Sequence, residues 1–331
     1  MKISHGIRNQ DILNIMKRVL IIAFAALAAM SSCKKEDTSL RLLYWNIQNG
    51  MWDGQGDNYD RFVKWVAGQD PDICVWCEGQ SIWKTDSDEA MAEEDRYLVE
   101  NWGELAARYG HNYWGIGGYR DSYPQIITSK YPIEYVAKIT GEEPDLLVTH
   151  GAGWATVEKN GRTINIVTLH TWPLAHAFRA EDKEASKADH GGDKYRRKEI
   201  EYICTHTIGS VPEAKDQLWM MMGDFNSRSR VDNGTYGYPE DDTRFLVHDY
   251  IRENTPYIDV IHEKYPDRFI SSTGGDSRID FVYCTQPLYD MITRAEIVTD
   301  DYTKPVRDPQ NLSNFWRPSD HKPIIVDFDL K

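Results

Sequence analysis

Short apolar runs alternate with polar segments along the chain from about residue 40. The runs contain many β-branched and aromatic residues, which is typical of β-strands. Asn160-Gly161 stands between two of them and favours a tight hairpin turn. The pattern predicts strands within residues 40–46, 71–78, 111–118, 124–130, 133–139, 145–150, 153–161, 162–170, 217–226, 268–273, 277–284, 291–299 and 322–330.

Four other segments predict helices. Residues 58–69 repeat apolar side chains at helical spacing, and residues 86–109 are rich in acids and alanine, which indicates a solvent-exposed helix. Further helices are expected at about 193–209 and within 240–265. Hairpin strands mixed with helices, without a break between domains, indicate an α+β fold of two packed sheets with helices outside. We expect one domain over residues 40–331.

The first 33 residues are not expected to belong to this domain. A basic stretch at 16–18 precedes the apolar run 19–30, which is too short to span a bilayer comfortably. Small residues just before Cys33 resemble a bacterial lipoprotein signal, in which this cysteine becomes the lipidated first residue of the mature protein. Residues 34–39 then form a short tether. An uncleaved membrane anchor is the less favoured alternative.

A lipid on Cys33 predicts an extracytoplasmic protein, with the outer membrane as the expected location. The charged residues 34–37 resemble the tag that sends some bacterial lipoproteins to the cell surface. The membrane is then contacted only through the lipid, and no protein partner is predicted.

The composition indicates a folded, acidic protein. The chain has 331 residues, 41% hydrophobic and 12% aromatic, which is enough for a large core. Its formal net charge is −14, and loss of residues 1–32, which carry four basic residues and one acid, makes it −17. This charge repels phosphate backbones at long range, so avid binding of long nucleic acid is not expected. A local cationic pocket is compatible with it.

Four cysteines follow Cys33, and the Cys-x-x-Cys spacing of Cys74 and Cys77 occurs in zinc and redox sites. No second pair accompanies it, and within a strand the two side chains point to opposite faces. We therefore interpret these cysteines as small buried hydrophobic residues.

Polar residues of a few types stand at the ends of the expected strands. Strand ends are where α/β and sandwich folds build their sites. A single pair such as Asp224 and Asn226 could serve only to cap a turn. The repetition of such residues at six strands favours a shared site. The residues are Asn46, Glu78, His170, Asp224, Asn226, Asp280, Asp320 and His321.

This set consists of carboxylates, amides and histidines without cysteine. Hard oxygen ligands match Mg²⁺, with Mn²⁺ or Ca²⁺ as alternatives, better than zinc. Phosphoester hydrolysis requires a metal to neutralise the phosphate, a carboxylate to orient or deprotonate water, and donors for the developing charge. The residue types at these strand ends supply each part.

The motifs around these residues are WNIQ at 45–48, WCEG at 76–79, TLHTWP at 168–173, GDFN at 223–226, RIDF at 278–281 and SDHKPI at 319–324. Their order resembles that of the endonuclease/exonuclease/phosphatase family over about residues 40–331. The resemblance implies a four-layer α/β sandwich, in which two mixed, mainly antiparallel sheets pack face to face with helices outside. It also implies a divalent-metal-dependent phosphoester hydrolase, with the site across the sheet edges.

The resemblance implies a role for each matching residue. Glu78 is the principal metal ligand, Asp320 lies by the metal, and Asn46 helps to hold metal or phosphate. Asp224 orients or deprotonates the attacking water, and Asn226 positions that water.

The histidines have separate implied roles. His321 contacts the scissile phosphate, and Asp280 holds its tautomer, a common arrangement for a catalytic imidazole. His170 stabilises the phosphate or assists the leaving group.

Two loops depart from the family pattern. HTWPLAH at 170–176 replaces a more polar segment, so Trp172 and His176 are expected to shape specificity. Tyr123-Pro124 replaces a pair of small residues, and Tyr123 and Arg120 are further candidates for substrate binding.

The substrate is predicted only as a class. A phosphodiesterase or phosphatase for a small or lipid-linked phosphate ester is favoured, because the acidic charge disfavours long nucleic acid. An extracellular or periplasmic nuclease is the first alternative, since divalent cations can screen that charge. A lipoprotein that binds phosphorylated ligands without turnover is the second, and the complete set of acid, base and metal residues argues against it.

Overall fold

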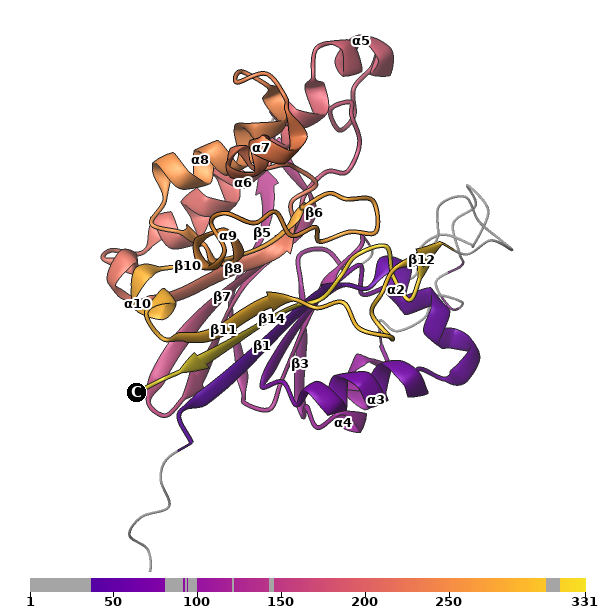
Figure 1. Cartoon of the computed structure of the whole chain (residues 1–331), viewed down its shortest axis with the longest axis vertical. Helices are drawn as coiled ribbons and strands as arrows, with labels where there is room; N and C mark the ends of the chain where they lie inside the picture. The colour runs from indigo at the N-terminus through magenta and orange to yellow at the C-terminus, as the bar shows by residue number, and fades with distance from the viewer. Residues whose placement is uncertain are drawn as a thin grey trace, which may run out of the picture. The chain divides into compact units, whose positions relative to one another are not determined.

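Two six-stranded β-sheets form the centre of the fold (Figure 1). The computed structural model describes residues 37–80, 92, 94, 100–120, 122–142, 146–307 and 316–331. The first sheet has the order β11–β14–β1–β2–β4–β3, with β1 (Ser39–Asn46), β2 (Ile73–Cys77), β3 (Tyr113–Gly117), β4 (Gln125–Ser129), β11 (Ile292–Ile297) and β14 (Ile324–Asp329). The second has the order β5–β6–β7–β8–β10–β9, with β5 (Ile133–Glu142), β6 (Leu146–Lys159), β7 (Arg162–His170), β8 (Leu218–Asp224), β9 (Ile258–Asp259) and β10 (Asp280–Cys284).

Helices and one small ribbon complete the structure. The ribbon pairs β12 (Val306–Arg307) with β13 (Trp316–Arg317). The α-helices are α2 (Gln48–Met51), α3 (Asp60–Gln69), α4 (Trp102–Arg108), α5 (Lys183–Ala188), α6 (Gly191–His206), α7 (Asn233–Tyr236), α8 (Leu246–Asn254), α9 (Val260–Lys264) and α10 (Gln286–Tyr289). Short 3-10 turns are η1 (Trp52–Asp57), η3 (Ile208–Ser210), η4 (Ala214–Asp216), η5 (Arg230–Asp232) and η6 (Thr243–Phe245).

Each sheet contains one parallel pair of strands near its centre. β1 and β2 run in parallel up to Asn46, which stands opposite Cys77, and β7 and β8 do so up to His170, opposite Asp224. Every other strand pair of the described residues is antiparallel. Parallel strands end at the same edge of a sheet. The residues that follow the two strands of each pair therefore lie close together.

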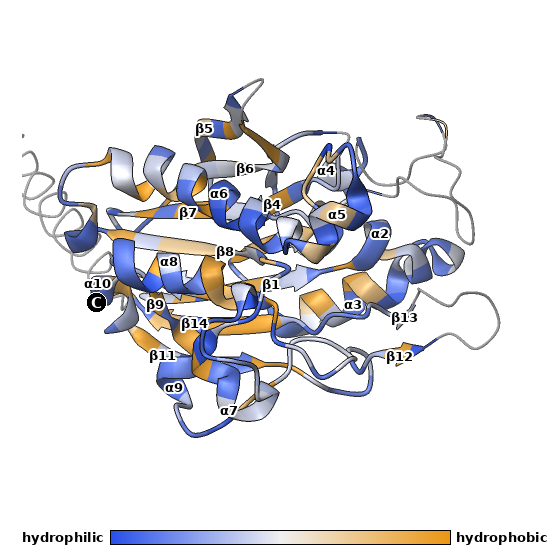
Figure 2. Ribbon diagram, turned by 90° about the horizontal axis from the view of Figure 1, so that it is seen from above, coloured by the Kyte–Doolittle hydropathy of each residue, from blue (hydrophilic) through white to orange (hydrophobic). Residues whose placement is uncertain are grey.

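Three apolar clusters join the layers, with α6 and α8 packed on the second sheet and α3 and α4 on the first. Figure 1 shows these helices outside the sheets, and Figure 2 shows hydrophobic residues on several of the strands. The run Met220-Met221-Met222 explains how a strand can be apolar throughout. Met220 and Met222 face the first sheet, while Met221 faces α6 and α8. A central strand that is buried on both faces needs no alternation of polar residues. The predicted four-layer sandwich of two mixed sheets is confirmed.

Several predicted elements match the structure. Asn160 and Gly161 both have positive φ, 54° and 68°, in the hairpin where Lys159 pairs with Arg162. Cys77 faces the other sheet and Cys74 faces the helices, so the two point to opposite faces. All four described cysteines are buried and free.

Other expectations need correction. The strands expected at 145–150 and 153–161 are one strand, β6, because Gly151 and Gly153 serve close packing against β3 rather than a break. A Cβ on Gly151 would lie 2.6 Å from the Cα of Gly118. The strand expected at 268–273 does not form, and a single bridge joins Thr273 to His321.

The helical predictions are partly right. The segment 240–265 contains two helices, α8 and α9, separated by the short strand β9. Within 86–109, α4 covers only residues 102–108 of the described part. Cys33 and the predicted signal lie outside the described residues. Of the residues that the structure describes, none belongs to a helix with the length and apolar character that a membrane crossing needs.

Candidate active site

Glu78 follows β2 directly and turns back toward β1. Its backbone is in the left-handed region, with φ 55°, which is unusual for a residue other than glycine and is found at functional sites. Its carboxylate Oε2 accepts a hydrogen bond from the backbone N of Asn49 at 2.7 Å, and Oε1 accepts one from Asn46 Nδ2 at 3.2 Å. The exits of the two parallel strands of the first sheet are therefore tied together.

Asp224 brings the second sheet to the same place. Asn46 Nδ2 also lies 3.1 Å from Asp224 Oδ2, so one amide group bridges a carboxylate of each sheet. Asn46 Oδ1 accepts from the backbone N of Gln48 at 3.0 Å. Both N–H donors of Asn46 and its oxygen are thus engaged within the protein, so Asn46 acts here by positioning the two carboxylates.

Two imidazoles also face Asp224. Asp224 Oδ2 is 3.7 Å from Nε2 of His170 and 3.7 Å from Nε2 of His321. Its other oxygen accepts from the backbone N of Asn226 at 2.9 Å, and the Asn226 side chain donates to the backbone oxygen of Thr171 at 3.0 Å. The GDFN segment thus folds around its own carboxylate at the exit of β8.

His321 is held by Asp280, which begins β10. His321 Nδ1 lies 2.7 Å from Asp280 Oδ2, which also accepts from the Ser272 hydroxyl at 2.7 Å. The Tyr44 hydroxyl donates to the other oxygen at 2.7 Å. Both oxygens of Asp280 are therefore occupied, and His321 Nε2 is left to face Asp224 and, at 3.8 Å, Asp320.

The carboxylates are poorly solvated. Burial, reinforced by the charge of Asp280, raises the pKa of Asp224 to about 7 against a lowering by His321. Burial also raises the pKa of Glu78, and the negative charge of Asp320 raises it further. Burial raises the pKa of Asp320 as well. Although burial acts the other way, the charges of Asp280, Asp320 and Asp224 raise the pKa of His321 well above its usual value. At neutral pH the imidazole of His321 is a cation among acids.

His170 is a neutral imidazole with a second histidine against it. Burial, together with the charges of His150 and His321, lowers the pKa of His170 well below its usual value. The His150 ring stacks on it with centroids 4.5 Å apart, and burial lowers the pKa of His150 to about 4. The Ser122 hydroxyl lies 3.0 Å from His150 Nδ1. One wall of the site is thus a pair of uncharged histidines.

The sequence of residues 43–321 matches the Endonuclease/Exonuclease/phosphatase family. The chain belongs to this family. Its members generally hydrolyse phosphoesters, and they include nucleases, phosphodiesterases and phosphatases. No sequence of a curated protein matches the chain.

Solved structures show the same fold. An AP endonuclease from Archaeoglobus fulgidus is similar at TM-score 0.58 and 15% identity, over 88% of this chain and 99% of that one. An endonuclease/exonuclease/phosphatase family protein from Bacteroides thetaiotaomicron is similar at TM-score 0.54 and 17% identity, over 88% and 99%. The human Nocturnin catalytic domain with bound sulfate is similar at TM-score 0.54 and 12% identity, over 89% and 95%. At these identities the likeness concerns the fold alone.

The donor set of this family member fits a divalent cation. Glu78 and Asp320 are partly buried carboxylates whose negative charges repel each other, so a cation between them would be stabilising. Asp224, Asp280 and His321 also offer ligand atoms within 4.8 Å of one another. Since Asp280 already accepts three hydrogen bonds, we favour Glu78 and Asp320 as the ligands. Carboxylate oxygens are ligands for hard divalent cations.

The four residues predicted to bind substrate lie in different settings. Tyr123 has its ring 6.2 Å from that of His170 and belongs to the site. Trp172 and His176 pack against each other in the loop after β7, with ring centroids 5.8 Å apart. Arg120 is ion-paired with Glu100, at 3.2 Å from its Nε. The geometry therefore favours Tyr123 over Arg120 as a residue that substrate contacts.

The loop after β7 is anchored by a carboxylate that the sequence did not single out. Glu199 on α6 is fully buried and accepts from the backbone N of Thr149 at 2.8 Å and of Trp172 at 2.9 Å. Burial raises its pKa to about 7. Thr149 precedes His150 and Trp172 lies two residues after His170, so Glu199 fixes the chain beside both histidines.

Sequence reasoning also missed His150, Tyr44 and Ser272. His150 ends the run 145–150, and the rule applied to the other strand ends would have selected it. Tyr44 stands two residues before Asn46, so strand alternation places both side chains on one face. No local signal marks Ser272, because its partner Asp280 is reached through a loop.

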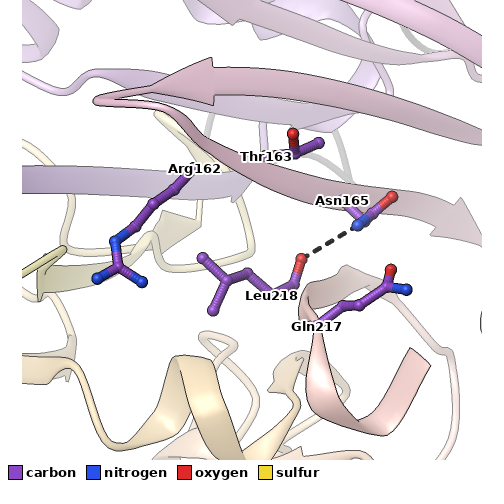
Figure 3. A pocket seen from close by; sticks show the side chains of 5 residues that line it. All are labelled: Arg162, Thr163, Asn165, Gln217 and Leu218. Atoms are coloured by element: carbon purple, nitrogen blue, oxygen red, sulfur yellow. Dashed lines mark hydrogen bonds between the residues drawn. The ribbon is translucent and has the colours of Figure 1, made fainter. Parts of the chain in front are cut away.

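One hollow on the described surface lies away from these residues. A cavity of about 500 Å³ is lined by Arg162, Thr163, Asn165, Gln217 and Leu218 (Figure 3). It lies at the start of β7 and β8. Its lining residue Leu218 precedes Asp224 by six residues along β8, and Asp224 stands opposite His170. At about 3.3 Å per residue this is about 20 Å from the histidines and carboxylates. The chemistry of the site, not the size of a cavity, identifies it.

Proposed function

We propose that this protein is a divalent-metal-dependent phosphoester hydrolase that acts outside the cytoplasm, in which the residues at the joined sheet edges activate water against a phosphate ester. The observation that supports this most is the position of Asp224 Oδ2. It lies 3.1 Å from Asn46 Nδ2 and 3.7 Å from Nε2 of both His170 and His321. These contacts hold the Asp224 carboxylate in place, and its burial makes it more basic than an exposed aspartate.

Asp224 is the proposed base. A pKa of about 7 means that near neutral pH it is partly ionised and still basic enough to accept a proton from water, which is the condition for general base catalysis. Asn226 fixes the orientation of this carboxylate through its backbone N. The residues that hold Asp224 therefore also determine where the proton goes.

His321 is the proposed donor to the phosphate. Its Nδ1 is held by Asp280, so Nε2 carries the proton that faces the site. A cationic imidazole at this place stabilises negative charge on a phosphate oxygen as the bond to water forms. Neutral His170 on the opposite side of Asp224 is positioned to donate a hydrogen bond to the departing group.

Glu78 and Asp320 would hold the cation. A bound divalent ion supplies positive charge that neutralises the phosphate and polarises its oxygens. Asn46 donates hydrogen bonds to both Glu78 and Asp224. The proposed metal ligand and the proposed base are therefore held in position relative to each other.

The proposal of an extracytoplasmic location rests on the sequence before residue 34. Small residues before Cys33 support a lipid-anchored protein. Labelling of cells with radioactive palmitate, compared between the natural protein and Cys33→Ala, tests it. Equal labelling of both would contradict the anchor.

The hydrolase proposal is tested with the purified protein and Mg²⁺ on four substrates: bis-p-nitrophenyl phosphate, p-nitrophenyl phosphate, DNA and sphingomyelin. Asp224→Asn and His321→Ala should each lower kcat by about 10²- to 10⁴-fold, the range for loss of acid–base catalysis. Circular dichroism and thermal melting should show both variants folded.

Matched controls change the same residue types on the surface. His206→Ala, at the exposed end of α6, and Asp216→Asn, in the exposed turn η4, should retain the natural rates. Natural rates in both Asp224→Asn and His321→Ala would refute the mechanism. Turnover of none of the four substrates would favour a binding protein.

A further inference from the structure

The loop that follows the GDFN motif carries an arginine without a carboxylate partner. Arg228 stands two residues after Asn226 and is half-buried. Its Nη2 donates to the Ser277 hydroxyl at 3.2 Å, and its buried Nε has no hydrogen-bond partner. Among the described residues, no Asp or Glu forms an ion pair with Arg228.

Two stacked tyrosines form the surface on which this arginine rests. The rings of Tyr236 and Tyr238 are nearly parallel, at 18°, with centroids 5.5 Å apart. Arg228 Cζ lies 5.6 Å from one centroid and 5.9 Å from the other. Asn233 fixes the backbone of Tyr238 through hydrogen bonds of 2.9 and 3.0 Å.

A second guanidinium shares this surface. Arg244 Cζ lies 4.1 Å from the Tyr238 centroid, and its charge is offset by Asp242 at 3.3 Å. The backbone oxygen of Arg244 accepts from the backbone N of Arg228 at 3.3 Å and from the Ser227 hydroxyl at 2.7 Å. The two cations are therefore held on the same side of the molecule by backbone contacts as well as by the ring.

A short series of contacts connects the arginine with the His321 side of the site. Ser277, its hydrogen-bond partner, donates through its backbone N to Thr273 Oγ1 at 3.2 Å. Thr273 forms a β-bridge with His321. Arg228 is thus connected with the site residues in two ways, through Ser277 and Thr273 to His321 and through the chain to Asn226.

An unpaired guanidinium at this place calls for an anion. A guanidinium has five N–H donors, and a partly buried cation is stabilised by an anion that takes them up. The chain as a whole carries −14, so this cation is not part of a general basic surface. Packing on tyrosine alone leaves the buried Nε of Arg228 unsatisfied.

We infer that Arg228, Tyr236 and Tyr238 form a subsite for a second phosphate group of a small organic phosphate, beside the phosphate whose ester is cleaved. The inference rests on the proposed function. The fork of a guanidinium matches two phosphate oxygens, and Arg244 adds attraction for the second charge of a phosphate dianion. The acidic charge of the chain favours a small bisphosphate over a long nucleic acid strand.

A matched pair of chromogenic esters tests the inference. Thymidine 5′-(p-nitrophenyl phosphate) and its 3′-phosphorylated form release the same p-nitrophenol from the same ester, and differ only in the second phosphate. The natural protein should prefer the second by about ten- to a hundredfold in kcat/KM, the factor expected for charge-assisted hydrogen bonds. Arg228→Ala should abolish this preference, and Arg228→Lys should restore part of it.

Binding is measured separately by calorimetry with thymidine 3′,5′-bisphosphate and thymidine 5′-monophosphate. The bisphosphate should bind the natural protein more tightly by a similar factor, and Arg228→Ala should reduce the ratio to about one. Arg197→Ala is the control, because Arg197 lies 3.8 Å from the Tyr250 ring on the surface of α6. It should leave the preference and the affinity ratio intact. Thermal melting checks that each variant folds.

The outcomes separate the two proposals. Absence of turnover with both esters contradicts the proposed function, while the affinity ratio still supports or overturns the subsite. A natural protein without preference in turnover and binding overturns the subsite. The same holds if Arg228→Ala weakens both ligands equally. A stronger, Arg228-dependent preference for single-stranded DNA over the bisphosphate overturns the assignment to a small substrate.

Discussion

The buried carboxyl of Asp224 is predicted to stabilise the metal-free protein more in weakly acidic than in weakly alkaline solution. Its pKa is about 7 in the folded state, against about 3.9 for an unfolded aspartate. The folded state therefore binds more protons between these values. The stability that this carboxyl contributes is fully present at low pH and is lost as the pH rises through this window.

The size of this effect follows from the two pKa values. Between pH 5 and pH 8 the difference corresponds to a loss of about 3 kcal/mol from this one group. Unfolding of Ser39–Lys331 carries an entropy of about 0.6 kcal/mol per degree at ~2.1 cal/mol/K per residue. Relative to the melting temperature of Asp224→Asn, that of the natural metal-free protein should therefore fall by about 5 °C between pH 5 and pH 8.

A divalent cation should reverse the loss. Mg²⁺ at about a hundred times its dissociation constant adds about 2.7 kcal/mol, or about 4 °C. The gain should be larger at pH 8 than at pH 5, because Glu78 and Asp320 have raised pKa values and protons compete with the cation at low pH. Scanning calorimetry at both pH values, with EDTA or with Mg²⁺, measures both effects.

Two glutamine substitutions distinguish stabilisation by a bound cation from the pH dependence that a buried carboxyl causes. Glu78→Gln removes a proposed ligand and should remove the response to Mg²⁺. Glu199→Gln removes a buried carboxyl with a pKa of about 7 that is not a proposed ligand, so it should reduce the pH dependence and keep the Mg²⁺ response. A full Mg²⁺ response in Glu78→Gln, or none in the natural protein at pH 8, would refute the assigned cation site.

Two further predictions concern residues that act through a neighbour. Asp280→Asn should lower kcat by about 10- to 100-fold, and it should move the alkaline limb of the pH–rate profile to lower pH, because His321 loses the partner that raises its pKa. An unchanged profile would show that Asp280 is only structural. His150→Ala should lower kcat by about two- to tenfold through loss of the ring that orients His170. His150→Phe, which keeps a stacked ring, should recover most of that rate in steady-state kinetics.

The strand ends could be predicted because apolar runs show where strands stop. Glu78, Asp224 and His321 are each the polar residue at the edge of such a run, and the sequence therefore located them without knowledge of the fold. Their mutual distances depend on which strands are parallel neighbours, and no periodicity contains that information. The family resemblance supplied the arrangement that the apolar pattern could not.

His150 shows why other parts of the site were missed. Because glycine usually interrupts strands, the sequence predicts two separate strands at 145–150 and 153–161, with His150 at the end of the first. In the structure these glycines allow Gly117 and Gly118 of the other sheet to approach closely. The conformational meaning of a glycine depends on what packs against it, which one sequence does not reveal.

Arg228 illustrates the same limit for loops. Its position two residues after Asn226 is evident in the sequence, but its neighbours come from residues 236–238, 244 and 277. A solvated arginine and one that rests on two tyrosines have the same local sequence. Only the folded loop distinguishes them.

The first and the last strand of the fold are neighbours. β1 pairs with β14 from Ser39 opposite Asp329 onward, and His321 stands just before β14. During synthesis, β1 must wait for almost the entire polypeptide to emerge from the ribosome before its partner exists. A chain that stops before β14 has an open strand edge and lacks His321, which the proposed reaction uses. We therefore expect incomplete translation products to be inactive and prone to aggregate.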